Sequence, residues 1–275
     1  NVSYQTILLL KKQSEKSREI IDLFSVIEGS NELPVPNKKH KLLKLFAETI
    51  KHTPFAYSFY LGHKTGEFYQ IINLNIKKGI KEELKAPLNA RWIIVKIAKS
   101  GTKYEEFLDK NLNLISLRKT NSSYVPSSRS WYKNALKIDE ISSTKPYKFS
   151  SLQKKGITFS KKINKDLIIG LDITIESIQA LLHKQNLVKG SEIFLFGDKG
   201  KVVAYSKIGS HTSKSIKNIN DIYPGVFMDE NYNEEPIITN ISGVEYFKYY
   251  PKLELKYGTK TYFAILSPRN KIMEP

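Results

Sequence analysis

The chain of 275 residues contains no cysteine. This absence excludes disulfide frameworks, thiolate metal sites and cysteine nucleophiles. It fits an extracytoplasmic domain but does not require one. Long hydrophobic runs are also missing, since no apolar stretch approaches the ~18 residues that a membrane-spanning helix needs. No signal peptide is recognisable at the N-terminus.

Arginine is scarce, although the chain is strongly basic. Lysine and arginine together number 44 against 27 acidic residues, which gives a net charge of +17. Such a charge favours a nucleic-acid or anionic-membrane partner. The lysines are scattered in pairs, however, without the arginine-rich stripe and interleaved aromatics of nucleic-acid readers. We therefore expect no nucleic-acid partner. The arginines are Arg18, Arg91, Arg118, Arg129 and Arg269.

Groupings that carry catalysis or hold metals are missing as well. The five histidines lie far apart and show no metal-ligand spacing. No Ser/His/Asp grouping or catalytic pair of carboxylates is evident. The acid-rich segment Asp229–Glu235 lacks the glycine and the spacing of an EF-hand, so a solvated loop is expected there. We predict neither an enzyme nor a bound cofactor or metal.

What is present describes a globular α+β protein. Hydrophobic residues make up 40% of the chain and aromatic residues 11%, enough for a sizeable core and two lobes. Helical periodicity and hairpin patterns predict one long helix followed by two antiparallel lobes. Helices are predicted over 1–30, 38–52, 129–136 and 176–185. Strands are predicted over 55–61, 68–74, 91–97, 112–117, 156–159, 167–175, 191–196, 201–206, 243–250 and 259–266. The predicted divisions are 1–36, 37–185 and 186–275.

The most informative segment runs from Tyr124 to Tyr132 and contains Arg129 and Trp131. Arginine binds a carboxylate through two parallel N–H bonds, and aromatic rings attract an ammonium group. Asp172 follows in the apolar run 167–175, where a carboxylate needs a partner. Two structural alternatives stay open. Trp131 packs a core in one, and Asp172 bonds backbone amides or caps the next helix in the other.

These motifs resemble a known family, the double-Cache sensor domains of bacterial transmembrane receptors. The likeness rests on Arg129-Ser-Trp131-Tyr132, on Gly170-Leu-Asp172, on the long first helix and on two lobes that each open with a hairpin. It implies an α+β fold of one long N-terminal helix and two stacked PAS-like (Cache) lobes, each with an antiparallel sheet flanked by helices. Lobe 37–185 would be membrane-distal and bind the ligand, and lobe 186–275 would be membrane-proximal.

A subgroup of the family binds amino acids or amines through a pattern that this chain matches. In that subgroup, arginine and its neighbours hold the ligand carboxylate, while tyrosine and aspartate hold the amine. Phe149 stands where amino-acid binders usually carry an acid, so we expect a bulkier, more apolar or N-substituted amine. The ligand-binding residues that the resemblance implies are Tyr124, Arg129, Trp131, Tyr132, Tyr147, Phe149 and Asp172.

The resemblance also implies a function and a setting. The domain would be the periplasmic, ligand-sensing part of an inner-membrane receptor, homodimeric through its N-terminal helix and bound to the membrane by transmembrane helices outside these residues. Its output part would be a histidine kinase, nucleotide cyclase, phosphodiesterase or chemoreceptor. Two alternatives remain. One is a small-carboxylate sensor in which Asp172 is only structural. The other is a degenerate Cache module that recruits a partner and binds no ligand directly.

Overall fold

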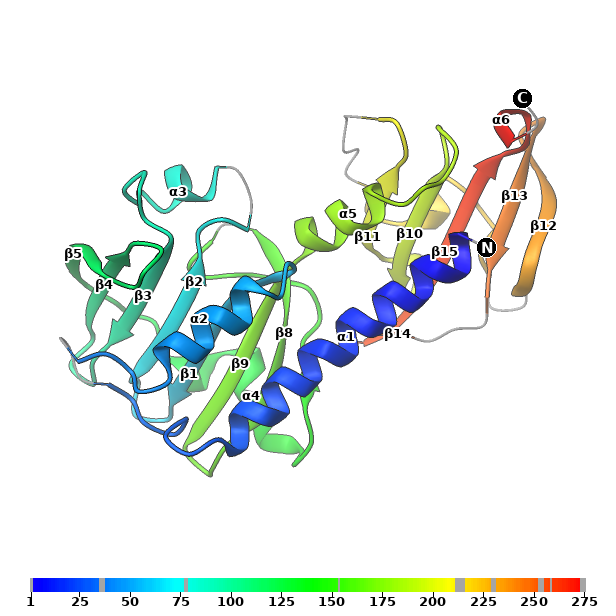
Figure 1. Cartoon of the computed structure of the whole chain (residues 1–275). Helices are drawn as coiled ribbons and strands as arrows, with labels where there is room; N and C mark the ends of the chain where they lie inside the picture. The colour runs from blue at the N-terminus through cyan, green and yellow to red at the C-terminus, as the bar shows by residue number, and fades with distance from the viewer. Residues whose placement is uncertain are drawn as a thin grey trace. The chain divides into compact units, whose positions relative to one another are not determined.

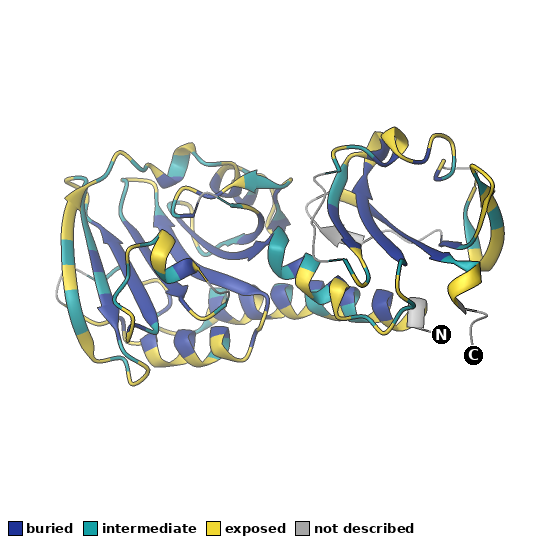
Figure 2. Cartoon of the chain, turned by 90° about the horizontal axis from the view of Figure 1, so that it is seen from above, coloured by how far each residue is buried: buried dark blue, intermediate teal, exposed yellow. Residues whose placement is uncertain are grey.

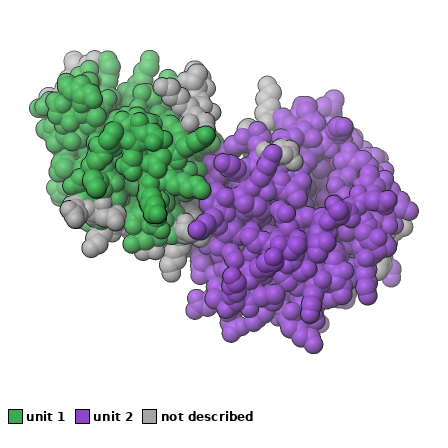
Figure 3. Space-filling model, turned by 180° about the vertical axis from the view of Figure 1, so that it is seen from behind, with its two compact units in different colours: residues 1–14, 178–275 green, residues 15–177 purple. Residues whose placement is uncertain are grey.

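The computed structural model describes residues 2–34, 38–76, 79–152, 154–210, 216–228, 231–251, 255–257 and 259–272. They form two compact units, coloured separately in Figure 3. Unit 1 comprises Asn1–Ser14 and Ile178–Pro275, and unit 2 comprises Glu15–Ser177. Each unit is built on its own antiparallel sheet, which confirms the predicted α+β class. The first helix, α1 (Val2–Val26), contributes residues to both units.

Unit 2 contains a sheet of nine described strands in the order β5-β4-β3-β2-β1-β9-β8-β6, with β7 also paired to β8 (Figure 1). β4 escaped prediction because lysine and two glutamates interrupt its apolar pattern. The strands are β1 (Ala56–His63), β2 (Phe68–Asn73), β3 (Trp92–Ile97), β4 (Thr102–Leu108), β5 (Leu114–Asn121), β6 (Ser142–Ser143), β7 (Tyr147–Lys148), β8 (Lys155–Lys162) and β9 (Leu167–Thr174). The helices are α2 (Leu43–Lys51), α3 (Ile80–Glu83), η1 (Pro126–Ser128) and α4 (Ser130–Lys137).

Both faces of the unit 2 sheet are buried, and Figure 2 shows the central strands in the dark blue of buried residues. Neighbouring residues of a strand point to opposite faces. Phe59 of β1 packs against Phe24 of α1 and Phe46 of α2, with ring centroids 5.0 and 4.6 Å away. Tyr60 belongs to a second buried cluster, which also contains Trp131 of α4. That second face carries the candidate site.

The described residues of unit 1 form a six-stranded sheet in the order β11-β10-β15-β13-β12, with β14 paired to β15. Its core is unusually aromatic and includes Phe194, Phe196 and Tyr250. Its strands are β10 (Glu192–Gly197), β11 (Val202–Lys207), β12 (Asn233–Ile241), β13 (Val244–Tyr250), β14 (Leu255–Tyr257) and β15 (Thr259–Pro268). Its helices are α5 (Ile175–His183), which begins in unit 2, η2 (Asp198–Gly200), η3 (Ile219–Asp221) and α6 (Arg269–Ile272).

The structure corrects some predicted boundaries. α1 ends at Val26 instead of residue 30, and α2 begins at Leu43 instead of residue 38. The prediction of a loop over Asp229–Glu235 is wrong for its last residues, since β12 begins at Asn233. This edge strand is largely exposed, so its apolar pattern is weak. Asp229 and Glu230 lie outside the described residues, as does Pro36 at a predicted domain boundary.

The two units divide the chain after residues 14 and 177, whereas the predicted divisions follow residues 36 and 185. The long helix is not a domain of its own in this division, because its residues are shared between the units. The membrane-distal and membrane-proximal roles of the lobes stay predictions.

Candidate functional site

Asp172 lies on β9 in the middle of the unit 2 sheet, and three hydroxyl groups donate hydrogen bonds to its carboxylate. Tyr60 donates from β1 to Oδ1 over 2.8 Å. Thr158 donates from β8 to the same oxygen over 2.5 Å. Ser58 donates to Oδ2 over 3.1 Å. Ser58 and Thr158 face Asp172 directly in the registers of the two neighbouring strands, so the sheet itself assembles this cluster.

The carboxyl group of Asp172 is buried, with 4% of the residue exposed. Removal from water raises its pKa from 3.8 to about 7, although hydrogen bonds from Thr158, Tyr60 and Ser58 and the charge of Arg129 act in the opposite direction. Asp172 therefore changes charge near neutral pH. It does not cap α5, because the Ser177 N–H bonds Thr174 Oγ1 over 3.1 Å.

Tyr60 holds its position because Gly170 leaves room for its ring. A Cβ atom at Gly170 would lie 2.4 Å from Cε2 of Tyr60. Gly170 is thus required because a larger residue there would displace the Tyr60 ring, whose hydroxyl bonds Asp172. Sequence reasoning missed Ser58, Tyr60 and Thr158. The available signal was the spacing of Ser58 and Tyr60, which are two residues apart and therefore lie on the same face of the strand.

Arg129 immediately precedes α4, and its guanidinium carbon lies 5.6 Å from the centroid of the Tyr124 ring. Trp131 Nε1 donates a hydrogen bond to the Tyr124 hydroxyl over 3.2 Å. The Trp131 ring in turn contacts Tyr60, at 4.9 Å between centroids. Within the described parts of the chain, no carboxylate forms an ion pair with Arg129. A continuous set of contacts therefore leads from Arg129 through Tyr124, Trp131 and Tyr60 to Asp172.

Tyr147 and Phe149 belong to the same cluster of side chains as Tyr60 and Trp131. The hydroxyls of Tyr147 and Thr158 are hydrogen-bonded over 2.7 Å, which links Tyr147 to Asp172 through one residue. The Phe149 ring meets Tyr147 edge-on at 5.3 Å and stacks on Tyr57 at 5.9 Å. Phe149 is 3% exposed and therefore forms an apolar wall of the cluster.

Tyr132 is the predicted residue whose hydroxyl is directed elsewhere. It donates to the backbone carbonyl of Asp166 over 2.7 Å, at the turn between β8 and β9. Its ring still touches Trp131, with centroids 5.6 Å apart. The structure thus connects five of the predicted side chains to Asp172 through hydrogen bonds or ring contacts, namely those of Tyr124, Arg129, Trp131, Tyr147 and Phe149. Tyr132 joins this cluster through its ring contact with Trp131.

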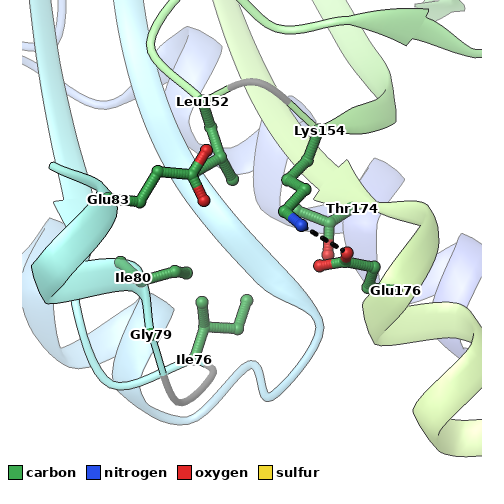
Figure 4. A pocket seen from close by; sticks show the side chains of 8 residues that line it. All are labelled: Ile76, Gly79, Ile80, Glu83, Leu152, Lys154, Thr174 and Glu176. Carbon is green, nitrogen blue, oxygen red and sulfur yellow. Dashed lines mark ion pairs between the residues drawn. The ribbon is translucent and has the colours of Figure 1, made fainter.

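A pocket of about 210 Å³ lies in the same unit. It is lined by Ile76, Gly79, Ile80, Glu83, Leu152, Lys154, Thr174 and Glu176 (Figure 4). None of the predicted ligand-binding residues lines it, but Thr174 follows Asp172 on β9. Over the residues whose positions are described, no three potential metal-binding side chains come together.

Chemically, the site offers a cation at one end and a buried carboxylate at the other. The arginine can bind a carboxylate in a bidentate manner, and the aspartate with its aromatic surroundings can hold an ammonium. The hydroxyls of Ser58, Tyr60 and Thr158 orient the carboxylate of Asp172.

Comparison with solved structures identifies chains of the same fold. The ligand-binding domain of the amino-acid chemoreceptor PctB of Pseudomonas aeruginosa, in complex with L-Arg, aligns with a TM-score of 0.59 and 13% identity over 100% of this chain and 95% of that one. The corresponding domain of the Pseudomonas fluorescens chemoreceptor CtaA, in complex with L-isoleucine, aligns with a TM-score of 0.55 and 14% identity over 98% of this chain and 90% of that one. The ligand-binding domain of the Campylobacter jejuni chemoreceptor Tlp3, in complex with 4-methylisoleucine, aligns with a TM-score of 0.54 and 17% identity over 100% of this chain and 93% of that one.

Curated relatives match parts of the chain. Adenylate cyclase 1 of Rhizobium meliloti is 22% identical over 194 residues, which are 68% of this chain and 29% of that protein. The chemotaxis protein PscA of Pseudomonas syringae is 29% identical over 107 residues, 38% of this chain and 16% of that protein. The chain thus spans less than a third of these relatives.

No family model matches the chain. Among the described helices, none combines the length and the apolar character that a bilayer crossing requires. The fold, by contrast, agrees over the whole chain with several solved domains. On that likeness, the chain has the double-Cache fold of the ligand-binding domains of bacterial chemoreceptors.

Proposed function

We propose that this chain is the extracytoplasmic ligand-sensing domain of a bacterial membrane receptor, and that unit 2 binds a small amine-bearing molecule. The observation that carries the proposal is the environment of Asp172. Its carboxylate is buried, is oriented by three hydroxyls and has no lysine or arginine in ion-pair contact among the described residues. An ammonium group would supply the missing counter-charge.

Arg129 supports a ligand that also carries a carboxylate. Its guanidinium lies in the electrostatic range of Asp172, since its charge lowers the pKa of that group. A zwitterion would place its carboxylate at Arg129 and its ammonium at Asp172. Several structures of the same fold hold amino acids, such as L-Arg in PctB and L-isoleucine in CtaA. The apolar Phe149 favours a ligand with an apolar or substituted group beside the amine.

Signalling would follow from unequal affinity. A ligand that binds one closure state of unit 2 better than another shifts the population by that difference alone. α1, whose residues belong to both units, is the element through which such a shift would leave the binding lobe. The full receptor would be a homodimer through this helix, anchored by transmembrane segments. The relatives support a cyclase or a chemotaxis protein as its output.

A second candidate is a sensor of small carboxylates. It is favoured by the hydroxyl partners of Asp172, which already satisfy much of that side chain, so that Arg129 alone would bind the ligand. The two functions differ in the effect of one substitution. Asp172→Asn removes the charge that an ammonium needs but leaves the site for a simple carboxylate intact.

The test is calorimetric titration of the wild type, Arg129→Ala and Asp172→Asn with a panel of amino acids, amines and small carboxylates. We expect Arg129→Ala to lose carboxylate-bearing ligands and Asp172→Asn to lose amines, each by about a hundredfold or more, since a buried charge left without its partner is costly. Equal binding of every ligand by all three proteins would refute the site. Binding of carboxylates that persists in Asp172→Asn but is lost in Arg129→Ala would identify the carboxylate sensor. No binding at all, together with capture of a periplasmic binding protein, would favour the interaction module.

A further inference from the structure

His40 is buried on the face of the unit 2 sheet that lies opposite the candidate site. The residue is 4% exposed, and its ring lies 4.9 Å from that of Phe46 on α2 and 5.1 Å from that of Tyr69 on β2. Phe68, the neighbour of Tyr69, belongs to the cluster around the site, and neighbouring strand residues point to opposite faces. α2 packs on β1 and β2 (Figure 1). The imidazole therefore anchors residues 38–42, the described segment that leads into α2.

The hydrogen bonds of His40 require a neutral ring. The Leu42 N–H donates to Nδ1 over 3.0 Å, so Nδ1 carries no proton and the ring proton is on Nε2. Nε2 is buried and makes no hydrogen bond of normal geometry among the residues that the structure describes. The carbonyl of His40 accepts from the Leu43 N–H over 3.0 Å. A second proton would have to bind Nδ1, where it would point at the Leu42 N–H and break that bond.

A buried lysine on the same face of the sheet holds the same segment. Lys96 of β3 pairs with Tyr69 in the register of the sheet and is 3% exposed. Its Nζ donates to Glu106 over 2.6 Å and to the carbonyl of Lys38 over 2.8 Å. Burial raises the pKa of Tyr69, so this side chain supplies no counter-charge. The segment is thus fixed at Lys38 by a cation and at His40 by a neutral ring.

The surroundings of His40 disfavour a positive charge on its ring. Burial lowers its pKa from 6.5 to about 4, and the charges of Lys41 and Lys96 act in the same direction. The backbone and the charge of Glu32 act in the opposite direction, but the Glu32 carboxylate is paired with Lys41 Nζ at 2.5 Å. An exposed histidine has a pKa of about 6.5. The ring therefore binds a proton more tightly once it has left this site.

We propose that His40 is an acid-sensitive anchor, and that its protonation expels the ring from beneath α2 and releases residues 38–42 while the sheet keeps its structure. Between about pH 6.5 and pH 4 the released state binds one proton more than the anchored state, so its population increases up to about tenfold per pH unit. Phe46 of α2 also packs against Phe24 of α1, with ring centroids 5.0 Å apart. Release would therefore loosen a contact of α1 without any ligand at Asp172, which lies on the opposite face.

Hydrogen exchange of the backbone amides, followed by NMR in the 275-residue chain, measures this release without a ligand. The Leu42 amide reports it directly, because it bonds the imidazole. After division by the intrinsic exchange rate at each pH, its opening constant should increase about fifteenfold from pH 6.5 to pH 5. His40→Asn should abolish the increase, because an amide oxygen can accept the same bond and does not titrate. His52→Asn is the matched control and should behave as wild type, since the His52 side chain is 74% exposed at the other end of α2.

The amides of β9 separate local release from unfolding of the whole unit. At pH 5 the Leu42 amide should open more readily than they do, and equal opening constants would show that acid unfolds unit 2 as a whole, so that the anchor would be wrong. An opening constant at Leu42 that does not change with pH, or an equal increase in His40→Asn, would also overturn the proposal. If His40→Asn does not fold, the ring signals of His40 in the wild type decide. A titration midpoint below about pH 5 supports the anchor, and one near the ordinary value of about 6.5 refutes it.

Discussion

The hydroxyl of Tyr60 donates a hydrogen bond to Oδ1 of Asp172 across two neighbouring strands, over 2.8 Å. Thr158 donates to the same oxygen, whereas among the residues that the structure describes Oδ2 accepts a hydrogen bond from Ser58 alone. A carboxylate oxygen accepts about two hydrogen bonds. Oδ2 therefore retains the capacity to accept one more, and this oxygen is where we expect a ligand ammonium.

Replacement of Tyr60 by phenylalanine should weaken amine binding and raise the pKa of Asp172. The hydroxyl stabilises the charged form, so its loss leaves more of Asp172 protonated at pH 7. We expect a loss of about 1 kcal/mol in unfolding free energy, the usual contribution of one hydrogen bond. Calorimetry measures the affinity for the amine, and urea unfolding measures the free energy of unfolding. Tyr57→Phe is the control, because its hydroxyl contacts Ser151 and not Asp172. A larger loss of amine binding in the control would contradict this assignment.

The stability of the ligand-free protein should depend on pH through Asp172. In the unfolded chain an aspartate has a pKa of about 3.9, whereas in the fold that of Asp172 is about 7. Between these values the folded state binds more protons, so stability falls as pH rises and levels off above pH 7. Asp172→Asn does not lose stability in this way as pH rises, because asparagine does not titrate. Its stability relative to wild type should therefore improve from pH 5 to pH 7.5, by up to about 1.4 kcal/mol per pH unit. Urea unfolding at both values tests the sign, and a relative decline of the variant would be inconsistent with it.

Amine affinity should follow the opposite course and rise with pH. An ammonium binds the ionised carboxylate, so binding below pH 7 must first release the proton of Asp172. Affinity should increase up to about tenfold per pH unit between pH 5 and 7 and then become constant while the ligand stays protonated. Titrations in buffers of different ionisation enthalpy would reveal the released proton. An affinity that does not vary with pH would mean that Asp172 is already charged or does not meet the amine.

The sequence predicted the elements with strong periodicity and the residues with unusual chemistry. The hairpin of β1 and β2 and the acid within β9 were recognisable because buried strands and a carboxylate among isoleucines are conspicuous. β4 and β12 were missed, since charged residues interrupt one and exposure removes the pattern of the other. Tyr60 and Thr158 could not be assigned, because their roles depend on the register that places them beside Asp172. Register across distant strands is not encoded in local periodicity.

The contact between Gly170 and Tyr60 supplies a test of the site that needs no ligand. A Cβ at Gly170 would lie 2.4 Å from the Tyr60 ring, so Gly170→Ala must displace either the ring or β9. Overpacking of this kind costs about 1–3 kcal/mol. The cost should nearly vanish in a Tyr60→Ala background, where the ring is absent, and the two substitutions should therefore be strongly non-additive. Urea unfolding of the four proteins in this cycle measures the coupling. Additive effects would show that Gly170 serves another purpose and that the ring does not rest on β9 as described.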